Sequence, residues 1–289
     1  MWAQFGLLSL IWGSAFALIR LAVTTLPPVV VAWGRLTLAA AALGGAVAAA
    51  GLRLPRERST WWRFAALGVV GNALPFFVIS WGQTRIDSHV TGILLGFVPV
   101  GTHLLAHYLL PDERLTLRVG GGVLLGFSGV AVLLGADVAD LLHGASGASV
   151  GKLAVLLGAV CYAFHAILTR RIPAMHPLVA STGVMICGSA ALAPIALASL
   201  AQSDVRPSAA SLGALVWLAV VGTGLATVVW FRLVASAGAG FATLTNYMTP
   251  LVAIACGALF WNEPIAPRAV LALVLVLGGI ALSQSARRA

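Results

Sequence analysis

The side chains best suited to recognise a small molecule in this chain are polar groups that stand inside otherwise apolar stretches. Asn72 and Thr223 are neutral hydrogen-bonding groups. Arg35 carries a fixed positive charge, and His165 can exchange a proton near neutral pH. A polar group in hydrocarbon is costly unless it finds a partner or a wet cavity. These groups therefore either bind a ligand or hydrogen-bond between helices, and the sequence leaves both interpretations open.

Counting inward from the ends of the expected membrane spans predicts which side chains lie near the midplane and face a cargo. The candidates for substrate binding are Trp12, Ser14, Arg35, Asn72, Phe76, His103, Tyr162, His165, Thr223, Thr227, Trp230 and Asn246. The candidates for a hinge or gate are Pro75, Pro99 and Pro250. A proline inside a helix removes a backbone donor and tends to kink the helix, and a kink that serves only packing is the alternative.

Arg35 is the only formal charge expected well inside a span, which makes it a candidate for function. It can meet a substrate carboxylate, cap carbonyls at a helix end or extend outward to the interface, and all three roles stay open. His103 and His107 have the i, i+4 spacing of two metal ligands, but no carboxylate or cysteine in the same span completes a set. We therefore expect no metal and no cofactor, and His165 is the better candidate for proton-linked chemistry.

The eight acidic residues are all expected in loops or at span ends, and none in the middle of a helix. A proton-driven exporter of cationic drugs usually needs a membrane-buried carboxylate that attracts the cation and releases it on protonation. Without one, the expected cavity is apolar and aromatic, with neutral hydrogen-bonding groups and one arginine. Such a cavity suits neutral or zwitterionic molecules and discriminates against organic cations. Transport would then run down the substrate gradient or use a histidine.

The composition requires that lipid surround most of the chain. Of the 289 residues, 60% are apolar and 9% are charged, whereas soluble domains carry about 25% charged residues. This excludes a soluble enzyme, a soluble binding module and a disordered chain. A helix needs about 20 mostly apolar residues to cross the hydrocarbon core. We expect an all-α polytopic membrane protein with ten spans, at about residues 4–23, 28–50, 61–82, 89–110, 116–135, 151–170, 178–201, 211–232, 240–261 and 268–285.

The formal charge of +9 comes from basic residues concentrated in one set of connections. If the N- and C-termini are cytoplasmic, most bases lie on the cytoplasmic side, as the positive-inside rule requires. They are scattered over short segments rather than clustered with aromatic residues, so nucleic acid is not an expected partner. The expected partners are the lipid bilayer and a small-molecule substrate. One chain can form all ten spans, which is compatible with a monomer.

The second half of the sequence repeats the first. The segment that begins FVPVGTHLLAHYLL aligns with the one that begins MTPLVAIACGALFW. The matched pairs include Pro99 with Pro250, Glu113 with Glu263, Gly129 with Gly279, Gly34 with Gly183, Gly71 with Gly222, and Asn72 with Thr223. Because each copy holds five spans, an odd number, the second copy must insert upside down. We expect one five-helix repeat at 1–143 and a second, inverted repeat at 144–289, with the substrate site between them.

Three features of the sequence resemble the EamA-type drug/metabolite transporter superfamily. They are the IWGSAF stretch of the first span, the proline-initiated second span with Arg35, and the P-x13-E-x4-R-x10-G pattern that begins at Pro99. The resemblance covers essentially the whole chain. It implies ten helices, cytoplasmic termini, a bacterial inner-membrane location and alternating-access export of small organic metabolites, often amino acids. Amino-acid exporters of the YddG type are the most similar group.

Three other functions remain as alternatives. A proton-coupled multidrug or metabolite antiporter of the same superfamily is the first. A membrane-embedded enzyme would need a nucleophile with its base, or a metal cluster, at one depth. The sequence holds neither an HExxH motif nor a pair of membrane-embedded acids, so no catalytic residue is expected. A channel is the third, because a leak and a gated carrier can share one sequence plan.

Overall fold

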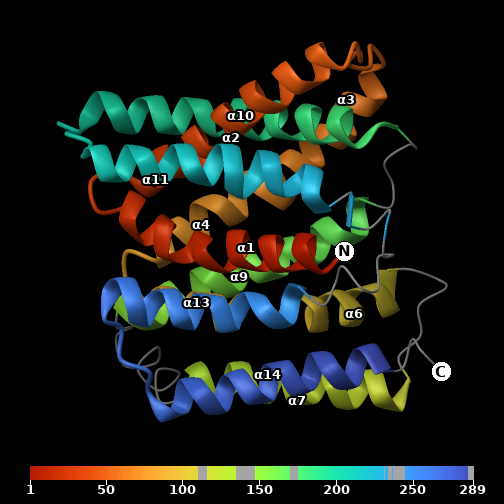
Figure 1. The fold of residues 1–289 in the computed structure, drawn as a ribbon, viewed down its shortest axis with the longest axis vertical. Coiled ribbons are helices and arrows are strands. Elements are labelled where there is room, and N and C mark those ends of the chain that lie inside the picture. Colours follow the sequence, from red (N-terminus) through yellow and green to blue (C-terminus); the bar gives the residue numbers. More distant parts are fainter. Residues whose placement is uncertain are drawn as a thin grey trace.

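The chain folds into a bundle of helices. The computed structural model describes residues 1–109, 116–134, 147–169, 175–230, 232–233, 236 and 245–285, and all regular structure among them is helical. The elements are α1 (Trp2–Ala22), α2 (Pro28–Ala49), α3 (Arg58–Gly68), the π-helix η1 (Val69–Ala73), α4 (Leu74–Gly82), α5 (Ser88–Leu95), α6 (Val98–Leu109), α7 (Leu117–Leu134), α9 (Gly147–Thr169), α10 (Pro177–Gln202), α11 (Ala209–Ala219), the π-helix η2 (Val220–Leu225), α13 (Thr245–Trp261) and α14 (Pro267–Ser285). Most of them lie side by side in one bundle (Figure 1).

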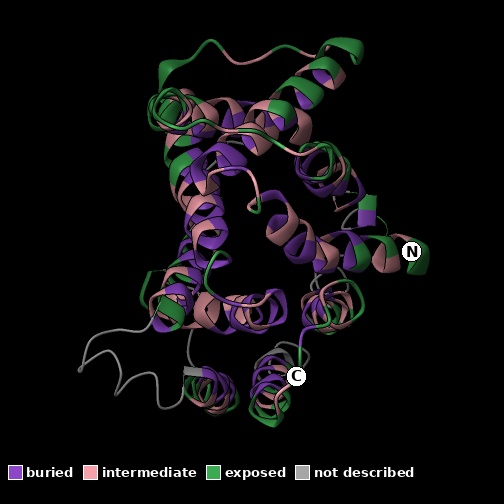
Figure 2. Ribbon diagram, turned by 90° about the vertical axis from the view of Figure 1, so that its left-hand side faces the viewer, coloured by how far each residue is buried: buried purple, intermediate pink, exposed green. Residues whose placement is uncertain are grey.

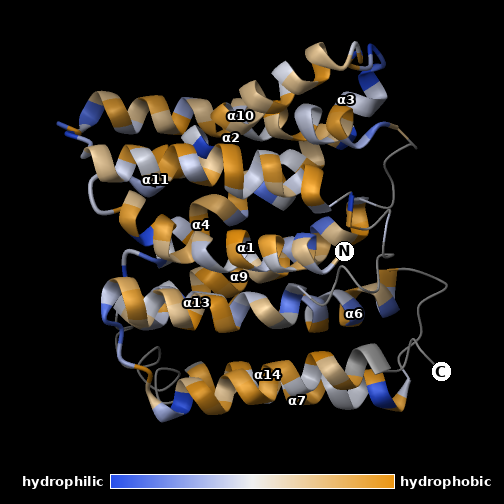
Figure 3. Ribbon diagram, viewed as in Figure 1, coloured by the Kyte–Doolittle hydropathy of each residue, from blue (hydrophilic) through white to orange (hydrophobic). Residues whose placement is uncertain are grey.

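Seven helical segments of the described chain are long and apolar enough to cross a membrane, and three shorter apolar helices fall in the fifth, ninth and tenth expected spans. Apolar residues run along the helices, and hydrophilic residues gather near the helix ends (Figure 3). The chain is therefore an all-helical, multi-pass membrane protein. The first residues of the ninth expected span, 240–244, lie outside the described residues.

Prolines mark where two of the longest helices begin. Pro28 opens α2 and Pro177 opens α10, because proline has no N–H to leave unpaired in the first turn and its φ already suits a helix. His176, just before α10, accepts a hydrogen bond from the backbone N–H of Leu178 at 3.3 Å. The start of a span can thus be read from local chemistry.

Helices from the two halves of the chain pack against one another. α2 lies along α10, α7 along α14, α1 against α13, and α4 against α9. Between α7 and α14 the backbones come close, since a Cβ on Gly279 would lie 2.6 Å from the Gly122 carbonyl oxygen and one on Gly129 2.8 Å from that of Ala272. Small residues at these positions let the two backbones approach closely. Buried residues lie on the sides of the helices that face one another (Figure 2).

Two of the membrane segments contain a π-helical insertion that the sequence did not predict. η1 interrupts the segment Arg58–Gly82, and η2 interrupts the segment Ala209–Trp230. A π-turn adds one residue per turn, so it shifts the faces of the helix on either side and leaves carbonyls displaced from their usual donors. Such insertions occur frequently at functional sites.

The three prolines expected inside spans occupy different positions. Pro250 lies inside α13, as expected. Pro75 lies in the first turn of α4, directly after η1. Pro99 lies in the first turn of α6, because the fourth segment breaks earlier, between α5 and α6. Pro194, which the sequence analysis did not single out, also lies inside a helix, α10.

Candidate functional site

A cavity of about 580 Å³ lies between the two halves of the bundle. Helices from both halves contribute to its wall, while α7 and α14 do not. Its lining residues are Trp12, Ala15, Phe16, Ile19, Arg35, Leu67, Gly71, Asn72, Phe76, Ile79, Leu95, Val98, Tyr162, His165, Thr169, Ala180, Ser181, Val184, Met185, Gly222, Thr223, Thr227, Trp230, Asn246 and Thr249. A volume of this size suits a metabolite or a drug-sized molecule.

All the substrate-binding candidates except Ser14 and His103 line this cavity. The Ser14 hydroxyl donates to the Ile11 carbonyl oxygen at 3.3 Å, within its own helix. Nδ1 of His103 lies 2.7 Å from the Pro99 carbonyl oxygen, one turn earlier in α6. The depth of both residues in their spans is that of the cavity, but depth does not fix which face of a helix a residue occupies.

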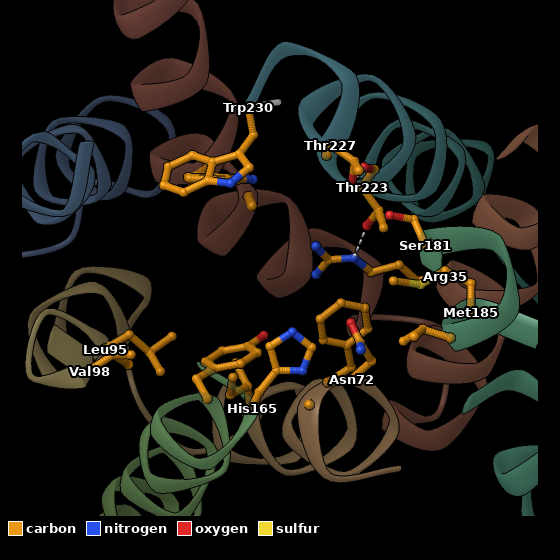
Figure 4. Close-up of a pocket in the computed structure, with 18 of the residues that line it drawn as sticks. Arg35, Asn72, Leu95, Val98, His165, Ser181, Met185, Thr223, Thr227 and Trp230 are labelled. Atoms are coloured by element: carbon orange, nitrogen blue, oxygen red, sulfur yellow. Dashed lines mark hydrogen bonds between the residues drawn. The ribbon is translucent and has the colours of Figure 1, made fainter. Parts of the chain in front are cut away.

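Several lining residues were missed by the sequence analysis. Ser181 and Met185 lie one turn apart on α10 and face the cavity (Figure 4). Thr249 lies on α13, and its hydroxyl donates to the Thr245 carbonyl oxygen at 2.8 Å. Thr249 adjoins Pro250 and follows Asn246 by three residues, so the helical period from Asn246 could have identified it.

The two π-helices place Asn72 and Thr223 on the cavity wall. Nδ2 of Asn72 donates to the Leu67 carbonyl oxygen at 3.2 Å. The hydroxyl of Thr223 donates to the Leu218 carbonyl oxygen at 3.1 Å. Each side chain therefore satisfies the carbonyl that lies five residues before it, and both bonds are buried. The acceptor atoms of the two side chains remain able to receive another donor.

Arg35 projects from α2 into the cavity (Figure 4). Its Nε donates to the Thr223 hydroxyl oxygen at 3.0 Å. Its guanidinium carbon lies 3.9 Å from the centre of the Phe76 ring, so the positive charge faces an aromatic surface. In the repeat alignment, which pairs Gly34 with Gly183, the counterpart of Arg35 is Val184. The arginine is thus a feature of one half only.

Aromatic rings form much of the remaining wall. The rings of Trp12 and Trp230 lie 5.5 Å apart between centroids, and Tyr162 reaches the cavity from α9. Nδ1 of His165 is buried and has no hydrogen-bond partner in the described part of the chain. The imidazole lies against Gly71 of η1, where any Cβ would collide with it. Glycine at this position therefore makes room for the histidine.

The described lining of the cavity carries a positive charge and no negative one. Among the described residues that line it, Arg35 alone has a fixed charge, and none is Asp or Glu. No group of three or more His, Cys, Asp or Glu side chains lies together within the described residues. The GASVG stretch at 147–151 has the spacing of a nucleophile motif, but it forms the first turns of α9, and Ser149 is buried outside the cavity lining. The arrangement suits the binding of a small molecule.

A separate polar cluster ties three segments together at one end of the bundle. Glu263, between α13 and α14, accepts backbone N–H donors from Ser88 at 2.9 Å and His89 at 3.1 Å, at the start of α5. The Ser88 hydroxyl and Nδ1 of His89 also contact the carboxylate, each at 2.8 Å. Arg20, in the last turn of α1, pairs with Glu263 and with Asp87, the latter at 2.7 Å.

These donors stabilise the charged form of Glu263, which lies outside the membrane helices. Burial alone would raise the pKa of its carboxyl group. The hydrogen bonds from the His89 side chain and from the Ser88 and His89 backbone outweigh that effect and lower the pKa to about 2. Glu113, which the repeat aligns with Glu263, lies outside the described residues.

Comparison with known families identifies both halves of the chain. The model of the EamA-like transporter family matches residues 1–135 and again residues 149–284. A solved crystal structure aligns over 99% of this chain and 96% of its own, with a TM-score of 0.68 and 22% identity. At that identity the likeness shows a shared fold alone.

Three relatives extend the comparison. An uncharacterized protein of Pseudomonas aeruginosa is 35% identical over 227 residues, which is 78% of this chain and 73% of the relative. The uncharacterized inner membrane transporter YedA of Escherichia coli K12 is 24% identical over 95% of this chain and 87% of its own. The protein PecM of Dickeya dadantii is 22% identical over 77% of this chain and 73% of its own.

Proposed function

The chain belongs to the EamA-like transporter family, and from this premise we propose that it exports small neutral or zwitterionic metabolites across a bacterial inner membrane. Amino acids, including aromatic and hydrophobic ones, are the proposed cargo. The single observation that carries this proposal is the cavity between the two halves, lined by aromatic rings and neutral hydrogen-bonding groups with no described carboxylate. An organic cation would find no counter-charge there. The inner-membrane location follows the name of the Escherichia coli relative.

Alternating access is the proposed mechanism, with two inverted five-helix repeats at 1–143 and 144–289 enclosing the site. The double match of the family model supports this arrangement. So does the packing, since α2 lies along α10 and α7 along α14, each helix against its repeat counterpart. Ten crossings place the N- and C-termini on the same side, which the positive-inside rule assigns to the cytoplasm. One chain contains the whole cavity, so a monomer suffices.

The shape of the cavity supports a state open toward the side of the N-terminus. Its lining includes Thr169 at the end of α9 and Asn246 at the start of α13. Glu263 follows the opposite end of α13, which at 1.5 Å per residue is about 22 Å from Asn246. The cluster around Glu263 closes that far end by joining α1, α5 and the connection before α14. With cytoplasmic termini, this is the inward-facing state.

Uptake into vesicles that contain the purified full chain tests the proposal. A panel of labelled amino acids, nucleosides and quaternary amines should give saturable counterflow with amino acids and none with quaternary amines. Counterflow also separates a carrier from a channel, because a leak does not drive labelled substrate against its gradient. Preferred transport of a quaternary amine would refute the proposal.

A proton-coupled antiporter is the second candidate, and His165 favours it. The imidazole reaches the cavity, whose described lining holds no acidic side chain that would keep it protonated. An imposed pH gradient across the vesicle membrane should then change the initial transport rate, and replacement of His165 by glutamine should abolish that change. A rate that does not respond to the gradient removes this candidate and leaves facilitated export.

A further inference from the structure

We propose that the cavity recognises its substrate through a carboxylate group that binds the two terminal nitrogens of Arg35, while the apolar body of the substrate packs against the aromatic wall. The substrate class is thus small monocarboxylates with an apolar body, zwitterionic amino acids among them. That such monocarboxylates are transported rests on the proposed function. That they bind to Arg35 in the cavity does not depend on it.

The charge of the cavity requires an anionic partner. Arg35 carries a positive charge into a space whose described lining holds no acidic side chain. A charge away from bulk water is costly unless it is paired and hydrogen-bonded. Neither terminal nitrogen of the guanidinium hydrogen-bonds to a described residue, and both point into the open part of the cavity (Figure 4). An anionic group on the ligand supplies the missing partner.

The contacts of Arg35 leave free the edge of the guanidinium that carries its two terminal nitrogens. Nε is occupied by the Thr223 hydroxyl at 3.0 Å, and one face of the group lies over the Phe76 ring at 3.9 Å. These two contacts fix the position and the plane of the group. The edge that carries the two terminal nitrogens is the one that forms paired hydrogen bonds with a carboxylate. The site is therefore organised before the ligand arrives.

The repeat shows that this arginine is not needed to build the scaffold. Thr223 and Asn72 are repeat counterparts and make equivalent bonds to Leu218 and Leu67. The counterpart of Arg35, however, is Val184, which also lines the cavity. Thr223 of η2 accepts the bond from Arg35, whereas η1 packs against α10, the helix that carries Val184, and forms with no described arginine bonded to Asn72. A structural requirement common to both halves therefore does not explain Arg35.

The ammonium group of an amino acid has weaker partners than its carboxylate. The described lining offers it only neutral acceptors, such as the Asn72 and Thr249 side-chain oxygens. A hydrogen bond from the ammonium group to a neutral oxygen is weaker than the paired hydrogen bonds between a guanidinium and a carboxylate, because in the latter both partners are charged. The carboxylate is therefore the required group, and the ammonium is tolerated.

Four compounds with one phenyl body separate these contributions: phenylalanine, 3-phenylpropionate, phenylalaninamide and 3-phenylpropionamide. Binding is measured by calorimetry on the purified full chain in nanodiscs. For the unmodified chain we expect both carboxylates to bind roughly tenfold or more tighter than either amide. In Arg35→Gln this preference should disappear. In Arg35→Lys part of it should remain, because a charge is kept and the fork is lost.

Arg85→Gln is the matched control. Arg85 is exposed, stacks on Trp81 at 3.5 Å and lies outside the cavity lining, so its loss should leave all four affinities unchanged. Thermal melting of each variant reports whether it folds, and Arg35→Lys tests the site if Arg35→Gln does not fold.

Three results would overturn the inference: amides that bind as tightly as carboxylates, a carboxylate preference that survives in Arg35→Gln, or no binding by any of the four compounds. Failure of the proposed function looks different. If the carboxylates bind through Arg35 but vesicles transport none of them, the export proposal fails and the inference stands. If vesicles export amino acids but binding ignores the carboxylate, the inference alone fails.

Discussion

Asn72 and Thr223 occupy equivalent positions in the two halves of the chain and make equivalent hydrogen bonds, each to the carbonyl five residues earlier. The bond lengths are 3.2 Å to Leu67 and 3.1 Å to Leu218. Each bond lies within or beside a π-helix, and each side chain lines the cavity. Both polar groups therefore stabilise a π-helix at the cavity wall; Thr223 also accepts the bond from Nε of Arg35, and the side-chain oxygen of Asn72 is an acceptor on that wall.

Replacement of Asn72 or Thr223 by alanine should weaken transport more than it weakens folding. The loss of one such bond costs about 1 kcal/mol of stability, whereas the proposed substrate cavity loses a polar group from its lining, and Thr223→Ala also removes the hydrogen-bond partner of Arg35 Nε. We expect initial vesicle transport rates to fall roughly tenfold and the melting temperature in detergent to fall by a few degrees.

Thr84→Ala serves as the control for these variants. The Thr84 hydroxyl makes the same kind of bond, to the Trp81 carbonyl oxygen at 2.8 Å, but it is exposed and lies outside the cavity lining. Its loss should change neither transport nor melting appreciably. Proportional losses of transport and stability in Asn72→Ala and Thr223→Ala would show that both groups are purely structural.

Glu263→Gln should destabilise the folded chain strongly. Glu263 is 5% exposed, and its carboxylate receives donors from Ser88, His89 and Arg20. Removal of its charge leaves Arg20 with Asp87 alone and weakens the bonds to the start of α5. A loss of about 3 kcal/mol is expected, measured as a lower midpoint in thermal melting. Asp204→Asn is the control, since its pair with Arg206 is exposed and should contribute almost nothing.

The contribution of Glu263 should also depend on pH. Its pKa in the folded chain is about 2, below the ordinary value of 4.5. The unfolded chain therefore binds the proton first as the pH falls, and the stabilisation is full above pH 4.5 and is lost as the pH approaches about 2. The side chains of Arg20, Asp87 and His89 also face this carboxylate, and they are present both in the unmodified chain and in Glu263→Gln. The difference in melting temperature between the unmodified chain and Glu263→Gln should therefore shrink on acidification, and a difference that grows would contradict the assignment.

The sequence predicted the helices well because their signals are local. Runs of apolar residues set the segments, and prolines set the starts of α2 and α10. The internal repeat added information of a different kind, because it aligned Asn72 with Thr223, and the structure gives both residues the same type of hydrogen bond. Most cavity candidates line the cavity because depth and the repeat together restrict where a polar residue can lie.

Other features have no local signal. A π-insertion keeps the apolar pattern of an ordinary helix, so η1 and η2 were not predicted. Glu263 lies far along the chain from Ser88, and no pattern in either segment indicates the other. Ser14 and His103 have the depth of cavity residues but bond within their own helices. The rotation of a helix about its axis is set by tertiary packing, which single-sequence depth does not contain.

Gly71→Ala should impair transport because it displaces His165. A Cβ at position 71 would collide with the imidazole, so the ring would have to move within the cavity or the π-helix would have to shift. Gly45→Ala is the matched control, because nothing lies within 4 Å of a Cβ there and alanine favours a helix over glycine by about 1 kcal/mol. We expect Gly45→Ala to melt at the same or a higher temperature with normal transport, and Gly71→Ala to melt lower and transport more slowly. Equal behaviour of the two variants would mean that the fit between Gly71 and His165 has no consequence for the cavity.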